Sequence, residues 1–397
     1  MAEKHASVFR SLQYFNARLF FAGLLLSNIG SWLQLTASSL LIYRLTGNAA
    51  DLGYNVAFQF LPMLLFGTWC GALADRHDRR RIALISQAAL AIQALLLGFL
   101  DLSGVINVPM VYALSLLLGV IGAFDNPARR GLVTELVPEV DLPNAMSLNT
   151  AVMTGSRIFG AAIATALVGP FGTGWLFILN GISYAAMIYS LTGLRKSEMY
   201  PAIMRPAGGS PVREVFKYVA GNRRLLTMFL VYVTVSTFSF NFGVALPKLA
   251  DLSWGDDRAF GWVMSVIGIG NLTGALLTAR LKTVSMSWFV GNIALLGIAS
   301  IGMAFASNVW LAFFWSIPLG IGGAAMIASG NAISQQESPP DMRGRLLALT
   351  AVAFLGSTPI GGPITGLIAD SISPEWSLAY GGVFALVCAA VAVVAWR

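Results

Sequence analysis

The sequence predicts an all-α membrane protein with twelve membrane-spanning helices in two six-helix halves. Of its 397 residues, 56% are hydrophobic and only 11% are charged, whereas about a quarter of the residues of soluble domains are charged. Continuous apolar stretches of about twenty residues recur, each long enough to cross a ~30 Å hydrocarbon core. The longest polar stretch lies at the middle of the chain. The bilayer is therefore the solvent for most of the molecule, and the chain divides near its midpoint.

The apolar stretches are continuous and rich in Gly, Ala and Leu, so they do not show the alternation that is typical of barrel strands. Helices are then the structure that satisfies the backbone hydrogen bonds inside lipid. The expected spans cover residues 18–43, 51–73, 82–102, 108–128, 146–169, 173–194, 225–246, 259–281, 285–306, 308–330, 345–369 and 376–396.

The distribution of basic residues predicts the orientation of the chain. An even number of spans places both termini on one side, and twenty-one of the 25 Lys and Arg residues then lie on that side. Three lie on the opposite side, and Arg157 lies within a span. Because cytoplasmic loops carry the excess of Lys and Arg, we expect both termini in the cytoplasm of a multi-pass protein of the bacterial inner membrane. The net charge of +7 is thus a mark of topology, and no nucleic-acid partner is expected.

The polar stretch at the midpoint predicts a linker between two halves. Residues 195–224 contain three prolines and an amphipathic run over 212–219, so we assign them to a cytoplasmic linker with an amphipathic helix. The N-terminal half is then 1–194 and the C-terminal half 225–397. A short repeat supports this division, since Gly67 to Leu73 matches Gly270 to Leu276. Parallel repeats of this kind place a substrate site between them near the midplane.

The loop between the second and third spans carries the most specific motif. Residues 71–80 match every specified position of the pattern G-x-L-A-D-R-x-G-R-R except one, where Asp78 replaces the second glycine. This loop, the Asn-Pro-Ala-Arg-Arg run at 126–130 and the Leu-Val-Pro-Glu run at 136–139 resemble the major facilitator superfamily. Within it they are similar to the branch of enterobactin exporters, macrolide efflux proteins and Tap-like multidrug pumps. The resemblance covers most of the chain and implies the major-facilitator fold with rocker-switch alternating access.

The same resemblance implies a conformational latch around this loop. A carboxylate at a helix end pairs with arginines and helix ends in one conformation and is released in another. The alternative is that these arginines only mark the cytoplasmic side. The expected latch residues are Gly71, Asp75, Arg76, Arg79 and Arg129.

Arg157 is the basic residue placed well inside a span, where a charge is expensive unless it meets a partner or water. Asp125 is the nearest acid by depth, and Glu135 is the second candidate. A charge relay, a contact with an anionic substrate and a structural ion pair all remain open for Arg157. Because no Asp or Glu lies near the middle of any span, proton coupling is implied by the resemblance, with Asp125 as the candidate group.

Two further sets of residues follow from the family analogy and from composition. Helices 1, 4, 7 and 10 are expected to line the substrate cavity, where amides among aromatic rings suit an amphipathic ligand. Small residues and prolines are expected at close helix contacts. The cavity candidates are Asn28, Trp32, Gln34, Phe238, Asn241, Phe313 and Trp315. The packing candidates are Gly160, Pro359, Gly361, Gly362 and Pro363.

The expected function is therefore a proton-coupled exporter of amphipathic small molecules, either drugs or a siderophore. A transporter of lysophospholipid or lipid-like substrates and an importer are the alternatives within transport. An intramembrane enzyme or a non-transporting receptor is less favoured, because no H-E-x-x-H, G-x-S-x-G or Walker motif occurs. We expect no enzymatic activity, cofactor or metal site. The expected partners of a monomer are the substrate, a proton or other coupling ion, and membrane lipid.

Overall fold

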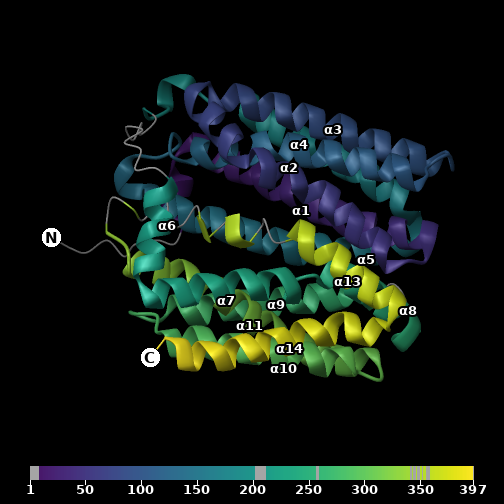
Figure 1. Cartoon of the computed structure of the whole chain (residues 1–397). Coiled ribbons are helices and arrows are strands. Elements are labelled where there is room, and N and C mark those ends of the chain that lie inside the picture. Colours follow the sequence, from purple (N-terminus) through teal and green to yellow (C-terminus); the bar gives the residue numbers. More distant parts are fainter. Residues whose placement is uncertain are drawn as a thin grey trace. The chain divides into compact units, whose positions relative to one another are not determined.

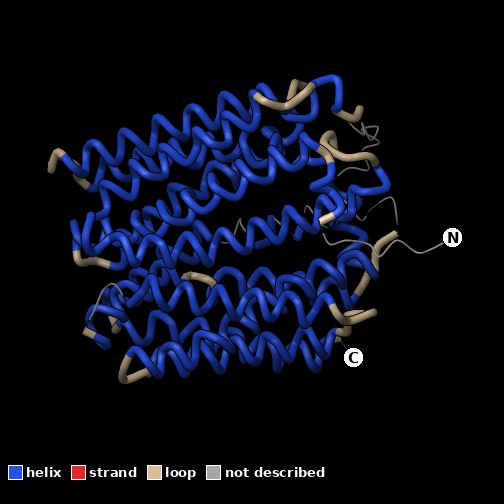
Figure 2. Tube along the Cα trace, turned by 180° about the vertical axis from the view of Figure 1, so that it is seen from behind, coloured by secondary structure: helices blue, strands red, loops and turns tan. Residues whose placement is uncertain are grey.

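Helices account for nearly all of the described residues in the computed structural model. It describes residues 9–201, 212–255, 259–339, 342, 346, 349–350, 352–354 and 358–396, and these contain no strand (Figures 1 and 2). The N-terminal helices are η1 (Arg10–Gln13), α1 (Phe15–Thr46), α2 (Ala49–Arg76), α3 (Arg79–Leu102), α4 (Val108–Val133), η2 (Glu139–Asp141), α5 (Leu142–Thr192) and η3 (Lys196–Glu198). The C-terminal helices are α6 (Val212–Gly221), α7 (Arg223–Ser239), α8 (Phe242–Trp254), α9 (Ala259–Ala279), α10 (Met286–Ala304), α11 (Val309–Gln336), α13 (Thr358–Ser371) and α14 (Pro374–Ala395).

These helices match the expected spans wherever the chain is described. Within the described residues, ten segments are long and apolar enough to cross a membrane, with α7 and α8 together forming one of them. The α5 segment is one of these ten but contains two expected spans. They are separated at Gly172, whose positive φ of 76° breaks the helix. The long helix α2 supplies the twelfth. The expected span 345–369 lies partly outside the described residues.

Side chains at the helix starts explain where several spans begin. Asp78 is the N-cap of α3 and accepts a hydrogen bond from the backbone N–H of Arg81 at 3.1 Å. Asn107, Asn308 and Ser373 cap α4, α11 and α14 in the same way. Each cap satisfies a backbone donor that the helix itself leaves free. The residue that departs from the loop motif, Asp78, therefore has a local structural role.

The chain forms two compact units. Unit 1 consists of Met1–Ala37 and Leu65–Pro206, and unit 2 consists of Ser38–Leu64 and Ala207–Arg397. The first parts of α1 and the last parts of α2 thus belong to unit 1, whereas the segment that joins these two helices belongs to unit 2. The division into halves at 195–224 stays a prediction.

In unit 1, α3 packs along both α4 and α5 (Figure 1). A core of buried apolar residues, including Phe20, Leu132 and Met187, joins α1, α4 and α5. Gly160 on α5 lies so close to α1 that a Cβ there would meet the carbonyl of Ile29 and the Cβ of Trp32. Small residues permit such an approach between membrane helices.

In unit 2, α9 packs against α11 and α10 against α14 (Figure 1). Gly274 on α9 faces the backbone of Ile321 on α11. Among the packing candidates, Gly361 faces the carbonyl of Thr237 on α7, and Gly362 lies beside Gly53 on α2. Pro359 and Pro363 lie within α13, and a Cβ at Gly53 of α2 would also meet the Cα of Pro363.

Many large apolar side chains point away from the protein interior. On α3, Ile92 and Phe99 are each 67% exposed, and on α14, Val394 is 76% exposed. Such exposure along whole helices would be unfavourable in water but is neutral in hydrocarbon. The solvent for these faces is therefore lipid.

The glycine contacts lead to a test of the packing. We expect Gly274→Ala to lower the stability by about 1–3 kcal/mol, since the added methyl group meets the rigid backbone of α11. Gly291→Ala on α10 is the matched control, because nothing lies within 4 Å of its Cβ position. This control gains helix propensity and should be neutral or stabilising. Thermal unfolding in detergent measures both, and equal midpoints would contradict the assignment.

Candidate functional site: a buried polar network in unit 1

A carboxylate with two partners stands at the centre of the network. Asp125 on α4 is 1% exposed. Its Oδ2 accepts a hydrogen bond from Arg129 Nε at 2.6 Å, and its Oδ1 accepts one from Gln87 Nε2 at 2.9 Å. The ion pair joins residues four apart on one helix face, the spacing at which side chains meet. Gln87 in turn accepts from the hydroxyl of Ser27 at 3.2 Å, so α1, α3 and α4 are connected.

The network continues through Asn28 to α5. Arg129 Nη1 donates to Asn28 Oδ1 at 3.4 Å, and Asn28 Nδ2 lies 2.9 Å from the sulfur of Met153. Asn28 itself is 4% exposed. The structure therefore brings together three residues that the sequence placed in different sets: Asn28 as a cavity candidate, Asp125 as a coupling candidate and Arg129 as a latch residue.

Arg157 lies beside this network but outside its ion pairs. Its guanidinium carbon is 4.8 Å from the centroid of the Trp32 ring, a cation–π arrangement. Its Nε is buried and has no hydrogen-bond partner within the described part of the chain. The acids expected to pair with it are engaged elsewhere, since Asp125 binds Arg129 and Glu135 binds Arg79.

Gln34 belongs to a second buried cluster in unit 1. Its Nε2 donates to Gln93 Oε1 at 3.1 Å, and its Oε1 accepts from Asn180 Nδ2 at 2.5 Å. Gln34 is 2% exposed, and both ends of its amide are satisfied by protein. In this conformation Gln34 stabilises the contact of α1 with α3 and α5.

The expected latch residues lie at the ends of α2, α3 and α4. Arg79 Nη1 pairs with Glu135 Oε1 at 3.0 Å. Burial raises the pKa of Glu135 above its usual value, although the hydrogen bond from Arg79 acts in the opposite direction. Arg76 is exposed, and Gly71 has open space around its Cβ position. The side chain of Asp75 lies outside the described side chains, so the latch stays a prediction.

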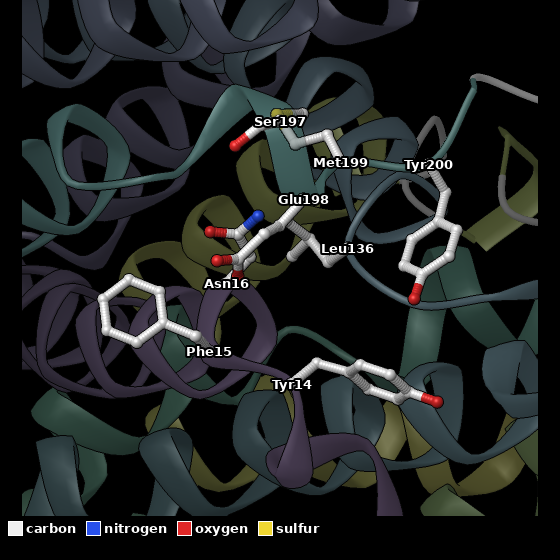
Figure 3. A pocket seen from close by; sticks show the side chains of 8 residues that line it. All are labelled: Tyr14, Phe15, Asn16, Leu136, Ser197, Glu198, Met199 and Tyr200. Atoms are coloured by element: carbon white, nitrogen blue, oxygen red, sulfur yellow. The ribbon is translucent and has the colours of Figure 1, made fainter.

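A cavity of about 280 Å³ lies near these helix ends, between the start of α1 and η3 (Figure 3). Tyr14 lines it and donates a hydrogen bond to Asp141 at 2.6 Å, and this bond raises the pKa of the tyrosine. Asp141 also pairs with Arg10 at 2.8 Å. The residues that line the cavity are Tyr14, Phe15, Asn16, Leu136, Ser197, Glu198, Met199 and Tyr200. None of the sequence-predicted cavity residues is among them.

The cavity candidates of the C-terminal half lie in unit 2. The ring of Phe238 stacks on Phe384 at 4.5 Å between centroids, which joins α7 to α14. Asn241 lies at the break between α7 and α8 and donates to the carbonyl of Thr237 at 2.7 Å. Trp315 packs over Gly302 of α10, and Phe313 contacts Trp310 on its own helix. Each makes helix contacts, and their role in substrate binding stays a prediction.

A polar cluster in unit 2 is absent from the sequence predictions. Lys248 on α8 pairs with Asp370 on α13 at 2.6 Å. Asp370 also accepts from the backbone N–H groups of Ala49 and Ala50, at 2.9 and 2.7 Å. These donors begin α2, where a negative charge is favourable. We call Lys248, Asp370 and the start of α2 the α2 clamp. A signal for it exists in the sequence, because Lys248 and Asp370 are charges near span ends on the same predicted side.

Metal ligands are not grouped in the described part of the chain, where no three His, Cys, Asp or Glu side chains lie close enough to hold an ion. The network instead consists of an ion pair, amides and an arginine held within a helical membrane fold. Such intramembrane charges are typical of transport proteins. Fold and site together describe a multi-pass membrane transporter.

The chain belongs to the Transmembrane secretion effector family of the major facilitator superfamily, whose family model matches residues 6–397. It is 22% identical over 362 residues to the Staphyloferrin A transporter of Staphylococcus aureus, covering 89% of each chain. It is 24% identical over 366 residues to the multidrug efflux pump Tap of Mycolicibacterium fortuitum, covering 87% of each. A solved bacterial homologue of the human lysosomal transporter Spinster matches with a TM-score of 0.77 at 15% identity, covering 96% of each chain. The predicted superfamily and fold are confirmed.

The Asp125–Arg129 pair permits a double-mutant test. We expect Arg129→Gln to destabilise the protein by about 3–5 kcal/mol, because it leaves a buried carboxylate without its cation. Asp125→Asn together with Arg129→Gln should cost less than the sum of the single changes, since neither charge is then unpaired. Thermal unfolding of the four proteins gives the coupling energy. Strict additivity would show that the pair is energetically unimportant.

Proposed function

We propose that this protein exports amphipathic small molecules across the bacterial inner membrane by gradient-driven alternating access. The observation that carries the proposal is the buried Asp125–Arg129 pair, placed inside the spans of a chain from this family. The efflux pump Tap among its relatives supports the direction of transport. The excess of basic residues on one predicted side supports cytoplasmic termini.

Asp125 is the group that we propose for proton coupling. It is 1% exposed and lies within the expected span 108–128. Protonation would neutralise it, weaken its bonds to Arg129 and Gln87, and free the arginine for its contact with Asn28. A proton could thus change how α1, α3 and α4 are held together. This is the kind of two-state local change that alternating access needs.

Flux in inverted membrane vesicles tests the export proposal. We expect a pH gradient to drive accumulation of at least one member of a panel of drugs, siderophores and lysophospholipids by the wild type. Asp125→Asn should abolish the dependence on the gradient while downhill flux remains. Asp75→Asn, the proposed latch variant, should insert normally and lose turnover. Accumulation that ignores the gradient would exclude proton coupling, and accumulation of lysophospholipid alone would favour the lipid alternative.

The α2 clamp is the second element that we propose to act in alternating access. It joins the segment between α1 and α2 to α8 and α13 within unit 2. The close approach of Gly366 to Ala49 and Ala50 strengthens the same contact. Opening of the transporter at the end opposite the predicted cytoplasmic side requires the clamp to break. The start of α2 cannot separate from α13 while Asp370 binds the first turn of α2. Tyr43, which donates to Asp251 at 2.6 Å, would have to release as well.

Labelling of an introduced cysteine tests the clamp. With Cys70 and Cys388 replaced by alanine, Val56→Cys places a thiol beside Gly362. We expect Asp370→Asn to increase its labelling by an impermeant maleimide from outside by about 5- to 30-fold, the effect of losing about 1–2 kcal/mol. Lys248→Arg keeps the charge and serves as the control. Unchanged labelling in Asp370→Asn would exclude a gating role.

A further inference from the structure

Arg157 is a cation in the membrane interior that no described acid balances. Its Nε is buried without a hydrogen-bond partner, while Asp125 and Glu135 are each bound to another arginine. A buried charge without a partner is strongly unfavourable, and the cost falls when a counter-charge arrives. The energetics of unit 1 thus favour a negatively charged group beside this side chain.

Close packing of α5 against α1 positions the Arg157 side chain. Gly160, three residues further along α5, lies on the same helix face and lets α5 approach α1 at Ile29 and Trp32. This approach places the guanidinium over the Trp32 ring. The guanidinium carbon lies 4.8 Å from the ring centroid, so the indole holds the cation beside α1. Trp32 and Arg157 are each intermediate between buried and exposed, so the Arg157 side chain is only partly covered although its Nε is buried.

We propose that Arg157 and Trp32 form a binding subsite for the anionic group of an amphipathic substrate. The inference deepens the proposed export function and rests on it for the identity of the ligand as a transported solute. A carboxylate or phosphate would accept hydrogen bonds from the guanidinium fork, which matches the geometry of these anions. The indole face provides a surface for an aromatic or apolar part of the same molecule.

The side chains around Arg157 favour the anionic group of a substrate over a permanent acidic partner within the protein. Asn28 and Met153, each four residues before one member of the pair, bind each other, and Asn28 also accepts a hydrogen bond from Arg129. They supply a neutral, polar neighbour rather than a counter-charge. The arginine is therefore fixed in position but remains available for an anion.

Binding of a matched pair of probes tests the subsite without any flux. Anthracene-9-carboxylate and its neutral carboxamide have the same rings, and their binding is measured by fluorescence in phosphatidylcholine nanodiscs at pH 7.5. We expect the wild type to prefer the carboxylate by about tenfold or more. Arg157→Met should weaken carboxylate binding by about 10- to 100-fold and leave the carboxamide unchanged, the range for one charged hydrogen-bonded contact. Arg157→Lys should be intermediate, because it keeps the charge and loses the fork.

Thermal unfolding of the ligand-free proteins separates this role from a structural one. If Arg157 serves a ligand, Arg157→Met removes an unpaired charge and the unfolding midpoint stays equal or rises. A lower midpoint together with unchanged carboxylate binding would show a structural ion pair and overturn the proposal. The matched control is Arg81→Met, which removes an exposed arginine at the start of α3 and should change neither readout.

The anionic headgroup of a lipid is the alternative occupant of the Arg157 subsite. In nanodiscs that contain phosphatidylglycerol, unchanged affinity of the wild type for the carboxylate supports a solute site. A fall in affinity that disappears in Arg157→Met would assign the site to a lipid headgroup and overturn the solute assignment. Because these assays need no gradient, the export proposal can fail in the vesicle experiment while carboxylate binding persists, and the two failures are distinguishable.

Discussion

The rest of the structure depends on the exclusion of water from the hydrocarbon core. Without water, every backbone polar group has to be satisfied within its own helix, and every charge has to find a partner in the protein. The first requirement explains the all-helical architecture and the capped helix starts. The second explains why Asp125 is bound by both Arg129 and Gln87. Arg157 is the exception among the described charges within spans, because it lies over an aromatic ring and pairs with no described acid, and we propose a ligand as its counter-charge.

Close contact between helices is the second consequence of the same solvent. Because lipid tails are as apolar as leucine, helices gain little by hiding apolar faces from them and associate through packing and polar bonds. Glycines therefore stand where backbones meet, as Gly274 does between α9 and α11 and Gly160 does between α5 and α1. At Gly160 this packing brings α5 to α1 where Arg157 lies over the Trp32 ring.

The two polar systems hold different parts of the chain. The network of Asp125 connects four helices of unit 1, whereas the α2 clamp joins the start of α2 to α8 and α13 in unit 2. Both contain a carboxylate that a single charge change would weaken. The relatives share about a quarter of their residues with this chain and the solved homologue still fewer, so the fold tolerates wide substitution. Differences in substrate are then expected at the few polar side chains within the spans.

The sequence by itself determined the class of fold, most of the spans and the superfamily, because apolar length and a contiguous loop motif are local properties of the chain. It also identified Asp125 and Arg157 as candidates for charge relay or coupling and Arg129 as a latch residue. The tertiary structure alone decided their partners: Arg129 binds Asp125, and Arg157 lies over Trp32 instead of an acid. Gln87, which completes the network, and the clamp between Lys248 and Asp370 were missed. Pairing depends on how each helix is rotated and how far it slides against its neighbours, and residues distant in sequence decide both.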